Sequence, residues 1–209
     1  MKRLIDVASW ARRENYLFFR DFPNPYYALT VRMDVTLARE RARRAGVRFS
    51  QYLCYAALRA VNSVEEMRYR QIDGEVWLFD AIRLNTPVAL PDHSFRSVII
   101  PSAPTLAAFA AEAERIRVAA LRGEGDAYGA DAIKDTFCIS INPWYDFTGL
   151  AFQSGPCPGE EIPIATVGKI CERDGRLSVP VATRFHHGFV DGYHVGQYLE
   201  RFQHNLDTL

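Results

Sequence analysis

The sequence predicts a mixed α/β fold, a two-layer sandwich in which helices pack on a mixed, largely antiparallel sheet. Two short turn sequences, Asp73-Gly74 and Asp174-Gly175, each lie between two β-rich runs and predict β-hairpins. Runs with helical periodicity occur between the strands, but without the regular strand–helix alternation of a parallel, doubly wound sheet. Hairpins pair their strands antiparallel, and the amphipathic helices must bury one face. We therefore expect the helices to cover the sheet.

The expected elements are short and follow one another without a Pro/Gly/Ser-rich linker or an internal repeat. In order, they are a helix over 6–18, a strand over 27–35, helices over 36–44 and 51–63, strands over 68–72, 75–79, 83–90 and 97–100, a helix over 104–122, strands over 137–141, 162–172 and 176–185, and a helix over 192–205.

The helices are predicted from apolar residues at helical spacing and from residues that favour helix ends. Trp10 and Leu17 are seven residues apart in the first helix. Thr36 and Ser50 are suited to cap the second and third helices, and Gly46 is suited to end the second. The residues expected to face the core from 51–63 are Tyr52, Leu53, Ala56, Ala57 and Ala60, and those from 192–205 are Val195, Tyr198, Leu199 and Phe202.

The strands are predicted from alternating or β-rich stretches bounded by turn residues. Residues 27–35 alternate, 137–141 form a short apolar run, and 162–172 and 176–185 are long β-rich runs on either side of the second hairpin turn. No Gly-rich phosphate loop of the P-loop or dinucleotide-binding kind follows any of these strands.

Length and charge limit the possible classes of protein. The chain has 209 residues, which fits one domain over 1–209 that can bury a sizeable core without disulfides or metals. Lys plus Arg and Asp plus Glu both number 25, so the formal net charge is zero. This balance argues against nucleic acid or an anionic membrane as a partner.

Cysteine usage and hydropathy suggest a cytoplasmic protein. The cysteines are not spaced as C-x-x-C and have apolar neighbours, so we expect buried free thiols in a reducing compartment. They are Cys54, Cys138, Cys157 and Cys171. No apolar run reaches signal-peptide length at the N-terminus, and none approaches the ~20 residues of a membrane span.

The candidate chemistry lies where the last strand meets the last helix. His186 and His187 end the strand, and Asp191 and Gly192 begin the helix, so a side chain in this corner can be both rigid and exposed. Histidine suits proton transfer near neutral pH. From the residues alone, a satisfied strand-end pair with Asp191 as a simple cap is an equal alternative. A metal site that also uses His194 is a weaker one, because adjacent strand residues point to opposite faces.

Several segments resemble the chloramphenicol acetyltransferase family. Residues 184–203, RFHHGFVDGYHVGQYLERFQ, resemble the family's C-terminal signature. Its H-H-x-x-x-D-G part is shared with dihydrolipoyl acyltransferases and peptide-synthetase condensation domains. Further similar segments follow in the family's order: SWARRE at 9–14, YALT at 27–30, SINPW at 140–144, and PIAT at 163–166 with Lys169. The resemblance covers nearly the whole chain and implies the fold of the CoA-dependent acyltransferases.

This resemblance implies a catalytic role for three residues. His187 would be the general base that takes the proton of an acceptor hydroxyl, which attacks acetyl-CoA directly. Ser140 would donate a hydrogen bond to the tetrahedral oxyanion, and Thr166 would help through a bound water. No metal is implied. Without the resemblance, Ser140 and Thr166 are ordinary strand residues.

The resemblance also implies supporting residues and an assembly. Asp191 would pair with Arg12 to hold the active-site turn, while Arg48 and Lys169 would lie near the phosphates of the coenzyme. These four residues could equally be solvated surface charges. The family is a homotrimer with sites at subunit interfaces. His187 would come from one subunit, and Ser140 and much of the acceptor pocket from its neighbour.

The acceptor pocket departs most from the family. Phe19 stands where a tyrosine is usual, Tyr26 replaces a small residue, and residues 123–128 diverge from an aromatic loop. The other expected wall residues are Phe95, Leu150 and Phe152. The leading hypothesis is O-acetylation of chloramphenicol, which would confer antibiotic resistance. The alternatives are the same chemistry on another hydroxyl or thiol, and a non-catalytic scaffold or binding module of this fold.

Overall fold

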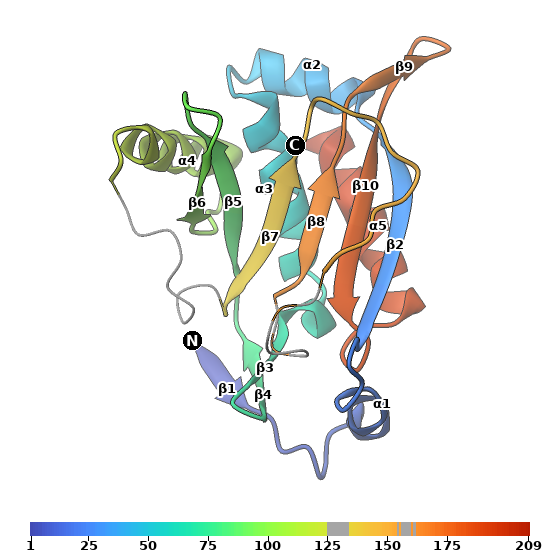
Figure 1. The fold of residues 1–209 in the computed structure, drawn as a ribbon. Helices are drawn as coiled ribbons and strands as arrows, with labels where there is room; N and C mark the ends of the chain where they lie inside the picture. Colours follow the sequence, from blue (N-terminus) through green and yellow to red (C-terminus); the bar gives the residue numbers. More distant parts are fainter. Residues whose placement is uncertain (125–133, 154, 156–159, 161) are drawn as a thin grey trace.

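The computed structural model describes residues 1–124, 134–153, 155, 160 and 162–209. Among these residues, seven strands form one sheet in the order β2-β10-β8-β7-β5-β6, with β9 paired to β10 (Figure 1). Four of its pairings are antiparallel, whereas β7 pairs in parallel with both β5 and β8. Its strands are β2 Tyr26–Asp34, β5 Arg83–Ala89, β6 Phe95–Ile100, β7 Thr136–Ile141, β8 Ile164–Val167, β9 Cys171–Arg173 and β10 Arg176–His186. The mixed, largely antiparallel sheet is confirmed.

A smaller sheet lies at one end of the molecule. It contains β1 (Lys2–Leu4), β4 (Glu75–Phe79) and β3 (Tyr69–Ile72), in that order. Asp73 and Gly74 have φ of 53° and 78°, the left-handed conformation that a two-residue hairpin turn requires. The predicted hairpin is therefore confirmed, whereas β1 was not predicted, because three exposed residues carry no periodic pattern.

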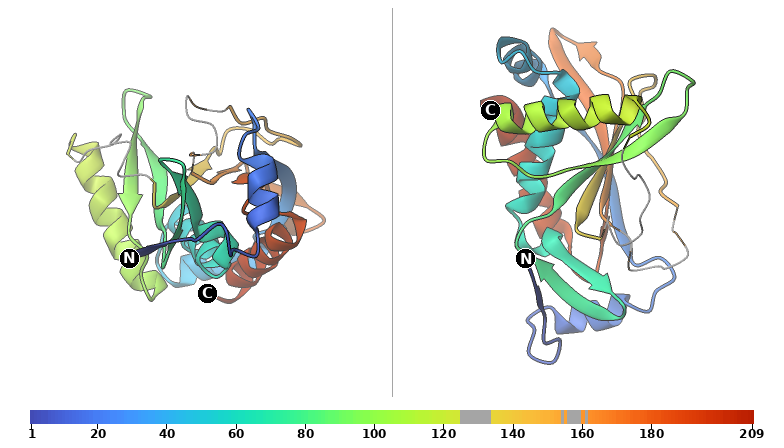
Figure 2. Two further views of the ribbon diagram at one scale, coloured as in Figure 1. Left: turned by 90° about the horizontal axis from the view of Figure 1, so that it is seen from below. Right: turned by 90° about the vertical axis from the view of Figure 1, so that its left-hand side faces the viewer.

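The helices gather mainly on one face of the large sheet. Figures 1 and 2 show α3 and α5 side by side behind the strands, with α2 at one end and α4 beside β5 and β6. Their bounds are α1 Arg13–Phe19, α2 Thr36–Arg44, α3 Phe49–Asn62, α4 Leu106–Leu121 and α5 Gly192–Thr208, with a 3₁₀ helix η1 at Glu65–Arg68. Helices that cover a sheet confirm the predicted layer arrangement.

Alternation along β10 separates the two faces of the sheet. The ring of Phe185 contacts those of Phe137 and Tyr198, so the odd-numbered residues of β10 face the helices. The even-numbered residues, including Ala182 and His186, face the other side. The residues predicted to face the core from α3 are at most 1% exposed, and Val195, Tyr198 and Phe202 of α5 are also buried.

One predicted strand is broken. Residues 162–172 form β8 and β9 with a gap between them. In this gap, Gly168 packs closely against Pro180 of β10 and Phe147. A Cβ at Gly168 would lie 2.6 Å from Pro180 Cγ and 2.8 Å from Phe147 Cε1. The Gly168 N–H donates to the carbonyl oxygen of Pro180 at 2.9 Å. This contact is between residues distant in sequence, which a periodicity analysis does not detect.

Helix starts also differ from the prediction. Residues 7–12 form turns rather than helix, so the first helix begins only at Arg13. Thr36 is not a cap, because Asp34 Oδ1 accepts the Thr36 N–H and Thr36 Oγ1 instead accepts the Leu177 N–H. Ser50 lies inside α3, which begins at Phe49. At α2 a nearby carboxylate therefore takes the place of the predicted cap.

The cysteines that the structure describes are free. Cys54 is buried, and burial raises the pKa of its thiol to about 12. Cys138 and Cys171 are half-buried rather than fully buried as expected, and Cys157 lies outside the described residues. Among the described helices, none is long and apolar enough to cross a membrane.

Candidate active site

His187 lies in the corner between the last strand and the last helix. β10 ends at His186 and α5 begins at Gly192, as the sequence predicts. The His187 N–H donates to the carbonyl oxygen of Pro25 at 2.7 Å, which anchors the corner to the segment before β2. This hydrogen bond therefore holds the backbone of His187 at the point where the chain reverses.

The imidazole of His187 is held in one orientation. Its Nδ1 lies 2.9 Å from the carbonyl oxygen of Val190. A carbonyl oxygen only accepts, so Nδ1 carries a proton, and in the neutral ring Nε2 keeps its lone pair. The ring stacks on Phe19 with centroids 4.2 Å apart and packs against Tyr27 at 5.0 Å. A half-buried imidazole whose Nε2 has no hydrogen-bond partner among the described residues is suited to accept a proton.

His186 points away from His187 and is buried. Its Nδ1 accepts the Gly188 N–H at 3.0 Å, and its ring stacks on Phe189 at 4.5 Å. Burial, helped by the adjacent His187, lowers the pKa of His186 to about 4, so this histidine is neutral at pH 7. Within the described part of the chain, no group of three or more His, Cys, Asp or Glu residues could hold a metal ion.

Gly188 lets the corner pack closely. A Cβ on it would lie 2.9 Å from His186 Cε1 and 3.1 Å from the backbone Cα of Tyr16. Tyr16 and Phe189 stack with ring centroids 5.6 Å apart. The corner therefore rests on a layer of aromatic side chains.

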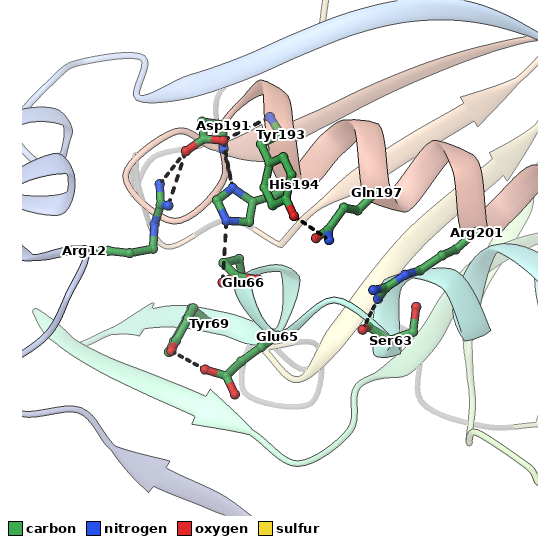
Figure 3. A network of polar contacts seen from close by, with 10 residues as sticks. All are labelled: Arg12, Ser63, Glu65, Glu66, Tyr69, Asp191, Tyr193, His194, Gln197 and Arg201. Atoms are coloured by element: carbon green, nitrogen blue, oxygen red, sulfur yellow. Dashed lines mark hydrogen bonds and ion pairs between the residues drawn. The ribbon is translucent and has the colours of Figure 1, made fainter.

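Asp191 closes the corner and begins α5. Its Oδ1 accepts the Tyr193 N–H at 3.0 Å, which makes it the N-cap. Its Oδ2 accepts from Nη1 and Nη2 of Arg12, both at 3.3 Å (Figure 3). Burial tends to raise the pKa of the Asp191 carboxyl, but His194, the Tyr193 N–H and Arg12 together hold it below its usual value.

His194 extends this group of polar contacts to η1. Its Nδ1 lies 2.9 Å from Asp191 Oδ1, and its Nε2 lies 3.5 Å from Glu66 Oε1 (Figure 3). Arg12, Asp191, His194 and Glu66 thus form a chain of four ionisable side chains behind the corner, on three different segments.

Ser140 and Thr166 lie together but away from His187. They are directly paired between β7 and β8, and Thr166 is also paired with Ala182 of β10. His187 is five residues beyond Ala182, about 16 Å along the strand. Within one chain, the two hydroxyls therefore cannot reach an atom bound at His187.

Among the expected acceptor residues, Phe19 is the one that contacts His187. Tyr26 and Phe152 instead surround Arg184, whose guanidinium carbon lies 4.3 Å and 5.7 Å from their ring centroids. Leu150 is half-buried on the segment between β7 and β8. Phe95 is 59% exposed on β6, at the far edge of the sheet from β2 and β10, and lies apart from His187.

A cavity of about 340 Å³ lies between α3, α4 and β5–β7. Its walls are mainly apolar and include Val98, Ile100 and Ile141, with Trp144 and Arg48 among the other lining residues. Ile141 lines the cavity, whereas its neighbour Ser140 points to the opposite face of the sheet. An elongated ligand with a charged end would fit this combination of walls.

Two arginines line this cavity and share one carboxylate. Glu114 accepts from Arg48 Nε at 3.2 Å and from Arg117 Nε and Nη2 at 2.9 and 2.7 Å. Lys169 is exposed and outside the cavity lining, although its N–H donates to the carbonyl oxygen of Tyr145, the residue after Trp144. Two cations for one carboxylate leave a net positive charge for an anionic ligand.

Sequence analysis missed several groups that shape this site. The Val190 carbonyl that orients His187 and the Glu66 carboxylate behind His194 come from tertiary contacts. Arg117 also gave no signal beyond a charged residue on a helix. The one available signal was the short spacing in sequence, because Val190 follows His187 by three residues and its carbonyl oxygen can therefore reach the imidazole.

Comparisons with known proteins agree with this architecture. A family model described as chloramphenicol acetyltransferase matches residues 2–203. A chloramphenicol acetyltransferase of Proteus mirabilis is 24% identical over 211 residues, covering 98% of this chain and 94% of its own length. A solved structure described as chloramphenicol acetyltransferase is 34% identical with a TM-score of 0.91, covering 99% of this chain and all of that one. A dihydrolipoamide acetyltransferase of Azotobacter vinelandii, 20% identical with a TM-score of 0.65 and covering 100% of this chain and 90% of its own, shares the fold.

Proposed function

The chain belongs to the chloramphenicol acetyltransferase family and is an acyltransferase, and we propose that it moves an acetyl group from acetyl-CoA to a hydroxyl of chloramphenicol. The observation that carries this proposal is the imidazole of His187. Its Nδ1 is fixed by the Val190 carbonyl, so its Nε2 is free to accept a proton. Acetylation of the antibiotic would confer resistance on the cell.

In the proposed reaction, His187 acts as a general base. Its Nε2 takes the proton of the acceptor hydroxyl as the oxygen attacks the thioester carbon, and the C–S bond then breaks to release the CoA thiolate. The proton held by His187 can pass to the departing sulfur, so no covalent acyl-enzyme forms. Such general-base assistance contributes roughly 10²–10⁴ in rate.

The cavity of about 340 Å³ supports a place for acetyl-CoA. Its apolar walls suit the pantetheine arm, and the arginines at positions 48 and 117 suit a phosphate group. Lys169 is exposed, and its backbone N–H donates to the carbonyl oxygen of Tyr145, the residue after the cavity residue Trp144, so it would add a further cation.

A second subunit would complete the site. Ser140 would stabilise the oxyanion and Thr166 would hold a water, yet both lie about 16 Å along the sheet from His187 in the same chain. We therefore propose a homotrimer in which His187 of one subunit faces Ser140 and Thr166 of its neighbour. Phe95, at the far edge of the sheet, would reach the acceptor pocket in the same way.

A thiol-release assay tests the proposal. Purified protein with acetyl-CoA should release free CoA when chloramphenicol is added, and His187→Ala should lower the rate by roughly 10²–10⁴. His204→Ala, which changes a histidine on the exposed side of α5, is the matched control and should keep the wild-type rate. If the wild type releases no CoA above background, the chloramphenicol claim fails. If His187→Ala is unchanged, the general-base assignment fails.

The same chemistry on another hydroxyl or thiol is the second candidate. Phe19, stacked on His187, brings a bare aromatic ring where the family has a hydroxyl. A panel of acceptors in the same assay decides between the two, since a better acceptor than chloramphenicol would favour this alternative. The scaffold considered from the sequence loses its support, because the family is one of acyltransferases.

A further inference from the structure

His194 takes no part in the proposed reaction, yet it lies between two carboxylates directly behind the catalytic corner. It is the third residue of α5, and its side chain is 11% exposed. Asp191 Oδ1 lies 2.9 Å from its Nδ1, and Glu66 Oε1 lies 3.5 Å from its Nε2 (Figure 3). Both ring nitrogens therefore face oxygens that can only accept hydrogen bonds.

This arrangement fixes the imidazole from two sides. Glu66 of η1 lies against Nε2, while the Asp191 carboxylate and the Asp191 N–H both lie against Nδ1. Arg12 holds the same carboxylate through Oδ2. Neighbouring Glu65 instead accepts from the Tyr69 hydroxyl at 2.8 Å.

A single peptide group connects His194 to His187. The carbonyl oxygen of Val190 accepts from His187 Nδ1 at 2.9 Å, and the N–H of the same peptide, which belongs to Asp191, lies 3.3 Å from His194 Nδ1. The His194 ring therefore contacts one side of the peptide whose other side orients His187.

We propose that His194, bridging Asp191 and Glu66, is a positioning residue that holds the Val190–Asp191 peptide and thereby the orientation of His187. The inference rests on the proposed role of His187 as general base.

Three variants test this role in the steady-state assay. His194→Gln lowers kcat by about 10–100-fold with KM unchanged, because the His187 ring loses its fixed orientation while the groups that bind substrate are untouched. Glu66→Gln lowers kcat by a smaller factor, because His194 keeps its contacts with Asp191. Glu65→Gln is the matched control and keeps the wild-type kcat and KM.

Nitrogen NMR tests the inference without any substrate. In protein with ¹⁵N-labelled histidine, the signals that disappear in His187→Ala identify His187. The Nδ1–H signal of His187 should broaden in His194→Gln and stay sharp in Glu65→Gln.

A His194→Gln variant with the wild-type kcat and a sharp His187 signal would overturn the inference. Absence of acetyl transfer by the wild type to any acceptor would defeat the proposed function instead. The nitrogen spectra would still decide whether His194 holds the ring of His187.

Discussion

The corner that carries His187 and the strand pair that carries Ser140 are built in different ways. The contacts that orient the ring of His187 come from its own chain and include the Val190 carbonyl and the ring of Phe19. Among the residues that the structure describes, Ser140 has one weak side-chain partner, Asn142 Nδ2 at 3.4 Å, and it lies on the sheet face opposite the core helices. A base needs a fixed tautomer, which one chain supplies, whereas the oxyanion donor needs a reacting atom that this chain alone does not bring to it.

The largest expected effect comes from mixing two inactive variants. His187→Ala and Ser140→Ala should each be nearly inactive alone, the second by roughly 10²–10³ in turnover. If each site combines His187 of one subunit with Ser140 of its neighbour, co-expression in mixed trimers restores about a quarter of the sites. The measurement is CoA release by the co-purified mixture.

Separately purified variants, combined only in the assay, control for residual activity of each one. An active co-expressed mixture would support the shared site. A mixture no more active than the separate variants would show that His187 and Ser140 do not act together across a subunit interface.

Acid should destabilise the corner through His186. In the unfolded chain this histidine titrates near 6.5, whereas in the folded protein its pKa is about 4. The folded state thus binds fewer protons between these values, so stability is full above about pH 6.5 and falls toward pH 4. The loss reaches about 3 kcal/mol.

Urea unfolding at several pH values measures this dependence. His186→Gln should flatten the curve over this window. His93→Asn, which changes an exposed histidine in a turn, should retain the wild-type slope. A His186→Gln curve as steep as that of the wild type would show that another group causes the acid loss.

A smaller effect is expected from Asp191→Asn. The amide still caps α5 but can no longer neutralise Arg12, whose side chain is only 15% exposed. The free energy of unfolding should fall by about 1–2 kcal/mol, with a lower rate of acetyl transfer because the corner loosens. Asp92→Asn, on an exposed turn where the carboxylate meets only Ser94, should change neither quantity. Equal behaviour of the two variants would argue that the Arg12–Asp191 pair contributes nothing to the corner.

Much of the fold could be predicted because its causes are local. Asp73-Gly74 and Asp174-Gly175 adopt positive φ values that these residue types tolerate, so both hairpin turns could be identified from two residues each. The buried faces of α3 and α5 follow from their periodicity. The strand expected over 162–172 failed at Gly168, because its neighbours there are Pro180 and Phe147, distant in sequence.

The candidate site shows the same division between features with local causes and features that depend on contacts distant in sequence. The sequence by itself determined which residues are present, namely two adjacent histidines, a capping aspartate and an arginine near the N-terminus. Only the tertiary structure decided that His186 is buried and neutral, that His187 keeps a free Nε2, and that a third histidine bridges two carboxylates. The reason is physical: a backbone conformation depends on neighbours in sequence, whereas protonation and orientation depend on the atoms that the fold brings within about 3 Å of a nitrogen.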